Sequence, residues 1–422
     1  MIYDVLVIGG GTSGLMAAVS ASLNGAQSIK IIEKNPSLGK KLLLTGGTRC
    51  NVTNNRPADE VIRHIPGNGK FLYSAFSNFD NYDIMAFFTD RGVALKEEDH
   101  GRMFPTTDSA KTILNVFIEE IKQAKIEVQT KVQVKSLVLD QDKQIGVVLD
   151  GGQVEMARTL ILAVGGKSYP RTGTTGDGYK LAKQAGHHIT PLYPTEAPIT
   201  SEEGFIKDKT LQGLTLRDID LKVLNPAGKT IINHRMDMIF THFGISGPAA
   251  LRCSMFVNQS LSQDSEKEVT MSLDCQPDLS YQDLRQAFVH AREDNYPGSL
   301  TKLLKQWMPE RYAKFLLDQC QISQDRSAHD LSNQQIEKLC QAIKAYSFKV
   351  TGTWPIEKGF VTGGGVNLKE IWPHAMQSKL NPHLFICGEL LDINGYTGGY
   401  NITAAFVTGY TAGQNAAWMS MS

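Results

Sequence analysis

The sequence predicts an α/β protein whose main domain is built on a parallel sheet and is interrupted by a β-rich insertion and a small helical domain. Three observations support this prediction. The first 35 residues follow a strand–helix–strand pattern. Alternating apolar residues, typical of antiparallel strands, begin near Pro191. An apolar strand followed by a long helix returns near the C-terminus. Because 422 residues exceed what one hydrophobic core usually organises, we expect two or three domains.

The N-terminal segment has the pattern of a βαβ unit. Tyr3–Ile8 is an apolar run of strand length, and a glycine-rich turn over Gly9–Gly14 follows it. The Ala-rich segment Leu15–Leu23 fits a helix that Gly25 ends, and Ile29–Glu33 fits a second strand. A strand–helix–strand unit of this length predicts a parallel pair with a right-handed crossover.

The next segments alternate between loop, helix and strand patterns. Residues 36–56 are polar and glycine-rich, which predicts a long functional loop. Asp108–Lys122 carries apolar residues at helical spacing, and Lys131–Asp150 predicts a hairpin that turns near Asp140–Lys143. Thr159–Val164 predicts another short buried strand.

The second half of the chain changes from strands to helices and back. Leu214–Leu224 and Lys229–His234 predict strands of an inserted β-rich domain, and Tyr281–Tyr346 has a helical pattern. Leu384–Cys387 predicts a further strand, and Asn401–Trp418 predicts the last helix. We therefore expect three domains with these bounds: a main domain over 1–190 and 357–422, a β-rich domain over 191–277 and 346–356, and a helical domain over 278–345.

Composition and charge exclude several classes of protein. The chain has 43 Lys and Arg residues against 43 Asp and Glu residues, so it has no overall electrostatic attraction to nucleic acid or to an anionic membrane. Its N-terminus lacks a signal peptide pattern, which predicts a cytoplasmic protein, and no apolar run is long enough to span a membrane. The six cysteines form no Cys-x-x-Cys pair, which argues against disulfides, a metal site and a dithiol redox centre.

The glycine motif Gly9-x-Gly11-x-x-Gly14 predicts a dinucleotide site because it follows a strand and opens a helix within a βαβ unit. We expect Gly9 to permit the tight turn, Gly11 to let a pyrophosphate approach the backbone, and Gly14 to let helix and strand pack closely. The pyrophosphate would lie at the helix N-terminus, where free N–H groups favour negative charge. Glu33, at the end of the second strand, is placed to bind ribose hydroxyls and to repel a 2′-phosphate.

A second glycine-rich segment near the C-terminus favours FAD over NAD. The strand ending at Cys387 runs into Gly388-Glu389, where a carboxylate suits the ribityl chain of a flavin. The following segment, Gly395–Asn401, opens a long helix whose N-terminal amides suit the flavin pyrimidine ring and the negative charge of the reduced flavin. These features predict a discontinuous Rossmann-type FAD-binding domain.

Four segments resemble one family of bacterial flavoproteins: DVLVIGGGTSG (4–14), GKKLLLTGGTRCNVTN (39–54), FTHFGISGP (240–248) and GELLDINGYTGGYN (388–401). The chain resembles, over essentially its whole length, the aminoacetone-oxidase-like or BaiN/YhiN-like NAD(P)/FAD-dependent oxidoreductases, and within them the aminoacetone oxidase branch. The resemblance implies an FAD domain, an inserted β-barrel-like domain and a small helical domain. This chain departs from the commoner form of the 39–54 loop at Thr48, where a third glycine usually precedes the arginine.

The glycine motifs and the resemblance together imply a set of FAD-binding residues. These predicted cofactor contacts are Gly9, Gly11, Thr12, Ser13, Gly14, Glu33, Lys34, Lys40, Lys41, Thr45, Gly46, Arg49, Cys50, Asn51, Val132, Ala163, Val164, Gly165, Asp177, Gly388, Glu389, Gly399, Tyr400, Asn401 and Ile402.

No residue stands out from the sequence as the catalytic group. His242 and Tyr400 are candidates: the histidine as an acid or base near neutral pH, the tyrosine, with Tyr396, as an aromatic wall for a small cationic amine. His242 fits equally well as a hydrogen-bonded residue at a domain seam. We expect Arg49 and Asn51 to orient their loop and to hydrogen-bond the cofactor, with a structural anchor as the alternative role of Arg49. For Asp177 we expect a helix cap or an indirect contact with the flavin.

The resemblance favours an oxidase that converts a small primary amine and oxygen to a carbonyl, ammonia and hydrogen peroxide. The first alternative is an NAD(P)H-dependent flavin reductase of a conjugated carbonyl substrate. The second is a flavin-carrying RNA-associated protein, against which the zero net charge argues. We expect a small-molecule substrate, with oxygen or NAD(P)H as co-substrate, and neither a nucleic acid nor a membrane partner. The sequence leaves the oligomeric state open.

Overall fold

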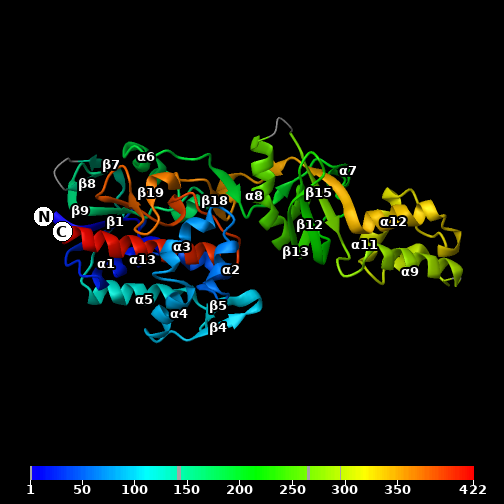
Figure 1. Ribbon diagram of the computed structural model, residues 1–422, viewed down its shortest axis with the longest axis horizontal. Helices are drawn as coiled ribbons and strands as arrows, with labels where there is room; N and C mark the ends of the chain where they lie inside the picture. Colours follow the sequence, from blue (N-terminus) through cyan, green and yellow to red (C-terminus); the bar gives the residue numbers. More distant parts are fainter. Residues whose placement is uncertain (1, 140–143, 264–266, 295) are drawn as a thin grey trace. The chain divides into compact units, whose positions relative to one another are not determined.

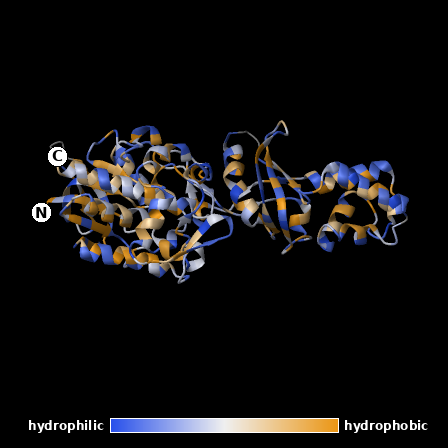
Figure 2. Cartoon of the chain, turned by 60° about the horizontal axis from the view of Figure 1, so that its bottom comes forward, coloured by the Kyte–Doolittle hydropathy of each residue, from blue (hydrophilic) through white to orange (hydrophobic). Residues whose placement is uncertain are grey.

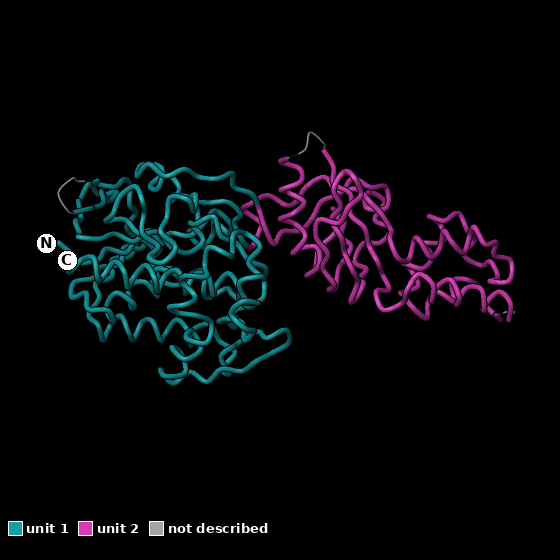
Figure 3. Tube along the Cα trace, viewed as in Figure 1, with its two compact units in different colours: residues 1–193, 361–422 teal, residues 194–360 magenta. Residues whose placement is uncertain are grey.

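The computed structural model describes residues 2–139, 144–263, 267–294 and 296–422. The chain divides into two compact units, coloured separately in Figure 3. Unit 1 comprises 1–193 and 361–422, and unit 2 comprises 194–360. Unit 2 therefore contains both the β-rich and the helical segments expected from the sequence. The predicted turn at Asp140–Lys143 lies outside the described residues.

Unit 1 is built on a sheet whose centre is parallel. Its strands follow the order β19-β20-β21-β9-β1-β2-β6, and β8 pairs with both β7 and β9. The run from β21 to β6 is parallel, while β19, β20 and β21 pair antiparallel. The strands of this sheet are β1 (Ile2–Ile8), β2 (Ile29–Glu33), β6 (Glu127–Thr130), β7 (Val134–Leu139), β8 (Ile145–Leu149), β9 (Val154–Leu162), β19 (Ile371–Trp372), β20 (Gln377–Ser378) and β21 (Leu384–Ile386).

Helices cover this sheet because its central strands are apolar on both faces. All five residues of β2 are buried, as expected for a strand in the middle of a parallel sheet. The helices α1 (Thr12–Leu23), α5 (Ala110–Gln123) and α13 (Tyr400–Ser420) run alongside it in Figure 1. A second, three-stranded sheet orders β3 (Thr53–Asn54), β5 (Arg102–Pro105) and β4 (Leu95–Glu98). The smaller helices are α2 (Ala58–Arg63), α3 (Tyr73–Phe76), α4 (Asn81–Thr89) and α6 (Asp177–Gln184).

The helices α1 and α13 approach each other backbone to backbone. A Cβ atom at Gly409 would overlap the carbonyl oxygen of Ser13, and one at Gly413 would overlap the carbonyl oxygen of Ala17. Both glycines lie one turn apart on the same face of α13. Their missing side chains therefore bring the C-terminal helix into direct contact with the helix that follows the first glycine turn.

Unit 2 contains an antiparallel sheet of seven strands in the order β16-β15-β12-β13-β14-β11-β17. The two ends of this order, β16 and β17, are separated in the chain only by Thr351, so the sheet curls back on itself. Its strands are β11 (Ile199–Thr200), β12 (Thr215–Leu224), β13 (Thr230–Phe240), β14 (Gly244–Ser246), β15 (Val269–Asp274), β16 (Tyr346–Val350) and β17 (Gly352–Thr353), accompanied by α7 (Gly204–Lys207) and α8 (Pro248–Gln263).

The helical part of unit 2 consists of α9 (Tyr281–Glu293), α10 (Leu300–Leu304), α11 (Glu310–Gln319) and α12 (Asn333–Ala345). Ser280 and Ser332 are the N-cap residues of α9 and α12, and each forms a capping box. The serine hydroxyl accepts the backbone N–H of the third helical residue, and the side chain of that residue accepts the backbone N–H of the serine. The helices show separate hydrophobic and hydrophilic faces in Figure 2. Their buried residues join those of the sheet in one continuous core.

Most predicted elements appear within a few residues of their expected bounds. The strands at Tyr3–Ile8 and Ile29–Glu33 and the hairpin after Lys131 are confirmed. The strand expected from Thr159 begins earlier, at Val154, because its first half pairs with β8. The strand expected at Lys229–His234 extends to Phe240 because β12 and β14 both pair with it. No helix among the described residues is long and apolar enough to cross a membrane.

The close contact of α1 and α13 predicts an unusual response to an alanine substitution. In a helix interior Gly→Ala normally stabilises by about 1 kcal/mol. We expect Gly413→Ala instead to destabilise unit 1 by about 3 kcal/mol, because the added methyl meets backbone that cannot move independently. Urea unfolding followed by circular dichroism measures this. Gly204→Ala, where the added methyl meets open space, is the matched control and should be neutral. Equal stability of the two variants would contradict the packing argument.

Candidate functional site

The glycine turn after β1 has the geometry that a dinucleotide site requires. Gly9 has a φ of +105°, and a Cβ there would lie 2.5 Å from the carbonyl oxygen of Ala163. A Cβ at Gly14 would overlap the carbonyl oxygen of Gly9, so only glycine lets α1 start this close to the strand. At Gly11, by contrast, a Cβ would meet nothing within 4 Å. The turn is therefore tight on its protein side and open at Gly11, where a pyrophosphate has room.

No side chain caps the N-terminus of α1, and the first turn of this helix contains no acidic residue. The helix N-terminus therefore keeps the donors and the positive end of the dipole that favour a phosphate. Glu33 is buried beside this turn: one carboxylate oxygen accepts the N–H of Gly10 at 2.7 Å, and the other accepts two N–H groups of Asn35, both at 2.7 Å. Glu33 thus holds the glycine turn against the end of β2, where a ribose contact was predicted.

A polar cluster joins three distant segments of unit 1. Glu389, in the short helix η8 (Gly388–Leu390), forms an ion pair of 2.7 Å with Lys41. Its other oxygen accepts the Ser168 hydroxyl at 3.0 Å and the Thr362 N–H at 2.9 Å. Burial, the largest influence, raises the pKa of Glu389, but the charge and hydrogen bond of Lys41 and the hydrogen bonds from Thr362 and Ser168 together outweigh it, so the pKa lies below its usual value. The carboxylate predicted to face the ribityl chain is therefore ionised and held in one position.

At the start of α13, uncapped helix N–H groups lie near a side-chain oxygen of Asn51. Gly399, with a φ of +97°, precedes the helix, and the position of its absent Cβ lies 3.1 Å from Oδ1 of Asn51. That Oδ1 atom is buried and has no hydrogen-bond partner among the described residues. The side chain of Asn401 instead closes its own loop, accepting from the N–H of Gly395 and donating to its carbonyl, both at 2.7 Å. A free acceptor beside N–H donors matches the edge of a flavin pyrimidine ring, which has carbonyl acceptors around an N–H.

The loop before Asn51 is conformationally strained. Gly46, Gly47, Thr48 and Cys50 all have positive φ, between +56° and +73°. Left-handed backbone costs a residue with a Cβ about 1–2 kcal/mol, and Thr48 carries this cost where the commoner family loop has glycine. Such strain is typical of segments that a functional site holds in place.

Arg49 anchors this loop to the small sheet. Its guanidinium bonds both oxygens of Glu98, at 2.8 and 3.2 Å, lies 3.3 Å from Asp108, and stacks 4.2 Å from the ring centre of Phe104. These contacts support the anchor interpretation, whereas a contact with the cofactor stays a prediction. Cys50 is fully buried, and burial raises its pKa to about 12, so it is a packed thiol.

The remaining predicted contacts lie around the ends of the same strands. Lys34 forms an ion pair with Asp177 at 2.8 Å, and Gln133 also donates to that carboxylate. Asp177 is the first residue of α6 and forms no side-chain cap, so the expected capping role is not observed. Val132 donates its N–H to the carbonyl of Glu33 at 3.2 Å, and Ala163 donates to Ile8 at 2.9 Å. Lys40 points to solvent.

The two catalytic candidates lie in different units. His242 is exposed in the turn between β13 and β14 of unit 2, with its ring edge against Phe243. Tyr400 is buried in unit 1 and stacks on His64, with ring centres 4.7 Å apart. The sequence analysis missed His64, whose Nδ1 donates to the carbonyl of Glu60 at 2.7 Å. No motif surrounds His64, so the sequence carries no signal that singles it out.

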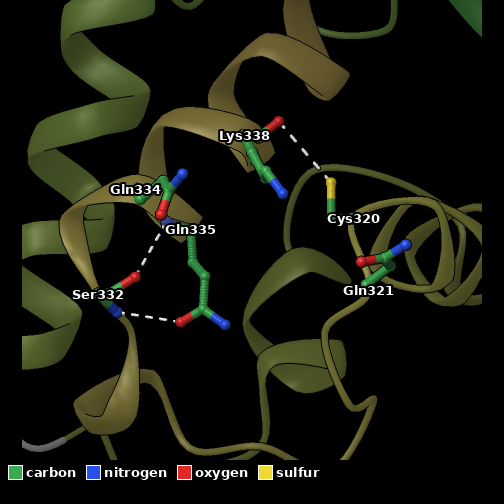
Figure 4. A pocket seen from close by; sticks show the side chains of 6 residues that line it. All are labelled: Cys320, Gln321, Ser332, Gln334, Gln335 and Lys338. Carbon is green, nitrogen blue, oxygen red and sulfur yellow. Dashed lines mark hydrogen bonds between the residues drawn. The ribbon is translucent and has the colours of Figure 1, made fainter.

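A separate pocket of about 290 Å³ lies in the helical part of unit 2, and none of the predicted site residues lines it. Figure 4 shows its polar lining, formed by Cys320, Gln321, Ser332, Gln334, Gln335 and Lys338. It has neither the apolar walls nor the convergent donors of a cofactor pocket.

The comparison with known proteins agrees with this geometry. A family model described as the HI0933-like protein Rossmann domain matches residues 3–415. The chain belongs to this family. It is 30% identical over 415 residues to a 3-dehydro-bile acid delta(4,6)-reductase of Clostridium scindens, covering 97% of this chain and 98% of that protein. It is 27% identical over 416 residues to a ribosomal RNA dihydrouridine synthase of Escherichia coli, covering 98% of each.

Among solved structures, a 3-ketosteroid delta1-dehydrogenase of Sterolibacterium denitrificans superposes with a TM-score of 0.51 at 14% identity, covering 99% of each chain. This likeness shows a shared fold. The family, the open glycine turn, the ionised Glu389 and the unsatisfied Asn51 fit one cofactor, FAD, and the chain is an FAD-dependent oxidoreductase. The resemblance expected from the sequence is thereby confirmed at the level of the family.

The open space at Gly11 predicts that a side chain there would block the cofactor without harming the fold. Because Gly11 has extended backbone and no neighbour within 4 Å, the apoprotein should accept Gly11→Val with little change in stability. The valine would occupy the space for the pyrophosphate, and we expect FAD affinity to fall at least roughly 100-fold. Flavin fluorescence titration and thermal unfolding of the apoprotein measure the two effects. Unchanged affinity would place the pyrophosphate elsewhere.

The Glu389–Lys41 pair predicts a loss of stability in acid. A carboxylate whose pKa is lowered by folding adds stability above its unfolded pKa, about 4.3, and loses it as the pH falls through the folded value. We expect Glu389→Gln to lower stability at pH 7 by about 2 kcal/mol and to flatten the decline below pH 4.3. Denaturant unfolding between pH 7 and pH 3 tests this, with exposed Glu119→Gln as the control. An unaltered acid decline would show that Glu389 does not cause it.

Proposed function

We propose that this protein is an FAD-dependent reductase that saturates a carbon–carbon double bond conjugated to a carbonyl group, with NAD(P)H as the reductant. The observation that carries this proposal is the chemistry shared by the names of two nearly full-length relatives. A 4,6-unsaturated 3-oxo bile acid and the uracil ring of uridine both contain a double bond conjugated to a carbonyl. Reducing either one consumes a hydride and a proton.

The residues of unit 1 have clear tasks in such a reaction. Bound FAD would accept a hydride from NAD(P)H and pass it on to the substrate. The N–H groups at the start of α13 would provide positive potential for the negative charge of a reduced flavin, and Asn51 would provide an acceptor beside them. Lys41 and Glu389 join the loop after β2 to the segment before α13 through their 2.7 Å ion pair, and these two segments would hold the cofactor. None of these tasks requires a redox-active thiol, and all six cysteines are buried and unpaired.

The oxidation of a small primary amine is the second candidate, supported by the resemblance of four sequence segments to the aminoacetone oxidase branch. The geometry supports it less well. Tyr396 and Tyr400, expected as walls for a cationic amine, are 7% and 2% exposed and pack against His64. Two buried rings offer little open aromatic surface to an ammonium group.

The nature of the reducible substrate divides the first proposal into two cases. A free conjugated ketone is the case expected from the balanced charge of the chain. The dihydrouridine synthase relatives add uridine within RNA as the other case, despite that balance. The predicted cytoplasmic location accommodates both cases and stays a prediction.

Anaerobic mixing of the purified flavoprotein with one reagent at a time separates these functions. We expect NADH or NADPH to bleach the visible flavin absorbance, and either a 3-oxo-4,6-diene bile acid or a uridine-containing RNA to restore it. Aminoacetone should leave the spectrum unchanged. Bleaching by aminoacetone, reversed by air with release of hydrogen peroxide, would instead establish the amine oxidase and contradict the reductase.

A further inference from the structure

Three polar side chains form a hydrogen-bonded row at the β19 edge of the sheet in unit 1. His187 follows α6, Glu370 ends the short helix η7 (Leu368–Glu370), and Ser378 ends β20. Nδ1 of His187 lies 3.0 Å from Oε2 of Glu370, and its Nε2 lies 2.9 Å from the hydroxyl oxygen of Ser378. The imidazole side chain is fully buried, and His187 is the only buried histidine among the residues that the structure describes.

The hydrogen bonds of Ser378 determine where the protons of this row lie. Its hydroxyl oxygen accepts the backbone N–H groups of Leu380 and Asn381, both at 3.0 Å. A serine oxygen has two lone pairs and one hydrogen, so the hydrogen is left to donate to Nε2 of His187. Nε2 must therefore be an acceptor, and the proton of the imidazole must lie on Nδ1, where it is donated to Glu370. His187 is therefore neutral and has a single tautomer.

The order Ser–His–Glu is also that of a hydrolytic triad, but this row gives a substrate no access. Ser378 is 2% exposed, and both lone pairs of its oxygen are occupied by backbone N–H groups. A nucleophilic serine needs a free lone pair that faces a substrate. The row therefore holds chain segments together and does not act as a nucleophile.

A second proton on His187 would break this arrangement. Nε2–H would face an oxygen whose two lone pairs are already occupied, so one buried N–H group would lose its acceptor. The pKa of His187 agrees with this conflict. Burial, the largest influence, lowers the pKa below its usual value of 6.5, although the hydrogen bond and charge of Glu370 act in the opposite direction.

The charged groups around the row leave His187 as the group on which weak acid acts. Glu370 also bonds His188, whose Nδ1 lies 2.5 Å from Oε1 and whose N–H lies 3.0 Å from Oε2. The His188 side chain is 82% exposed, so it can take up a proton in water and keep this contact. The neighbouring segments add five exposed groups, none of which forms an ion pair with Glu370 among the described residues: Lys180, Lys183, Lys369, His374 and Lys379.

Glu370 itself stays ionised in weak acid. Burial raises its pKa, but the hydrogen bonds from His188 and His187 outweigh this effect, so the pKa lies below the usual value of 4.5. At about pH 5 the carboxylate is therefore still charged, and the added proton goes to an imidazole.

We propose that His187, Glu370 and Ser378 form a pH-sensitive latch, which holds β19 and β20 on the segment after α6 at neutral pH and opens in weak acid. Both α6 and β19 are labelled in Figure 1. The latch joins elements that continue into the candidate site, because α6 begins at Asp177, and β20 pairs with β21, which ends just before Glu389. The inference is independent of the proposed reaction.

Hydrogen exchange of the wild-type protein measures the opening. A histidine whose pKa is lowered by folding stabilises the closed latch above its unfolded pKa, about 6.5, and this stability is lost as the pH falls through the folded value. We expect the backbone amides of residues 366–380, followed by mass spectrometry and normalised to the intrinsic rate at each pH, to exchange roughly tenfold faster at pH 5 than at pH 7.

Two glutamine variants identify the responsible histidine. His187→Gln keeps both hydrogen bonds, because the amide oxygen accepts from Ser378 and the amide N–H donates to Glu370, but it takes up no proton. We expect this variant to lose the acid acceleration. His188→Gln, which changes the exposed histidine on the same carboxylate, is the matched control and should keep it. Acceleration that persists in His187→Gln, or that is absent from wild type, would overturn the latch.

A second measurement needs no variant. Long-range nitrogen–proton NMR of wild-type protein with ¹⁵N-labelled histidine reports which ring nitrogen carries the proton. We expect one histidine to be protonated on Nδ1 alone at pH 7 and to remain neutral at about pH 6, where the exposed histidines become charged. If the neutral histidines all carry the proton on Nε2, the hydrogen-bond assignment of His187 is wrong and the latch is excluded.

Discussion

Unit 1 depends on the contact between the backbones of α1 and α13. Gly409 and Gly413 leave no side chain between the two helices, so Ser13 and Ala17 lie directly against the C-terminal helix. The same contact brings the two glycine turns together, because a Cβ at Gly388 would overlap the side chain of Ser13. A cofactor that spans both turns needs them at one fixed separation. Two segments almost 380 residues apart therefore act as one site because two helices pack without side chains between them.

Electrostatics then gives each carboxylate of the site a separate task. Lys41 keeps Glu389 ionised, while Lys34 does the same for Asp177. Burying these groups without a cation would be costly, and pairing offsets that cost while fixing three loops in position. Asp392 lies on the same loop as Glu389, and its carboxyl group accepts the hydroxyl of Thr190. Among the residues that the structure describes, Glu389 therefore has a cationic partner, whereas Asp392 forms no ion pair.

Unit 2 is stabilised mainly by apolar side chains that its sheet and its helices share. Its antiparallel sheet and its helices share a continuous apolar core, in which Phe205 packs against Phe240 of the sheet and Phe315 of the helices. The relatives named as a bile acid reductase and as an RNA dihydrouridine synthase match this chain over nearly its full length, unit 2 included. The family match over residues 3–415 therefore includes both units, and the side chains of a site, not the shared fold, determine its chemistry.

The sequence by itself determined the strand–helix–strand start, the cofactor class and the family, because glycine spacing and apolar periodicity are local properties of the chain. It also predicted the helices of unit 2, whose serine caps and helical spacing are local as well. Only the tertiary structure decided that Arg49 binds Glu98, that His64 stacks on Tyr400 and that Lys41 pairs with Glu389. Each of these facts depends on residues distant in the chain. Charge neighbours and burial set the chemistry of a side chain, and both arise only when the chain has folded.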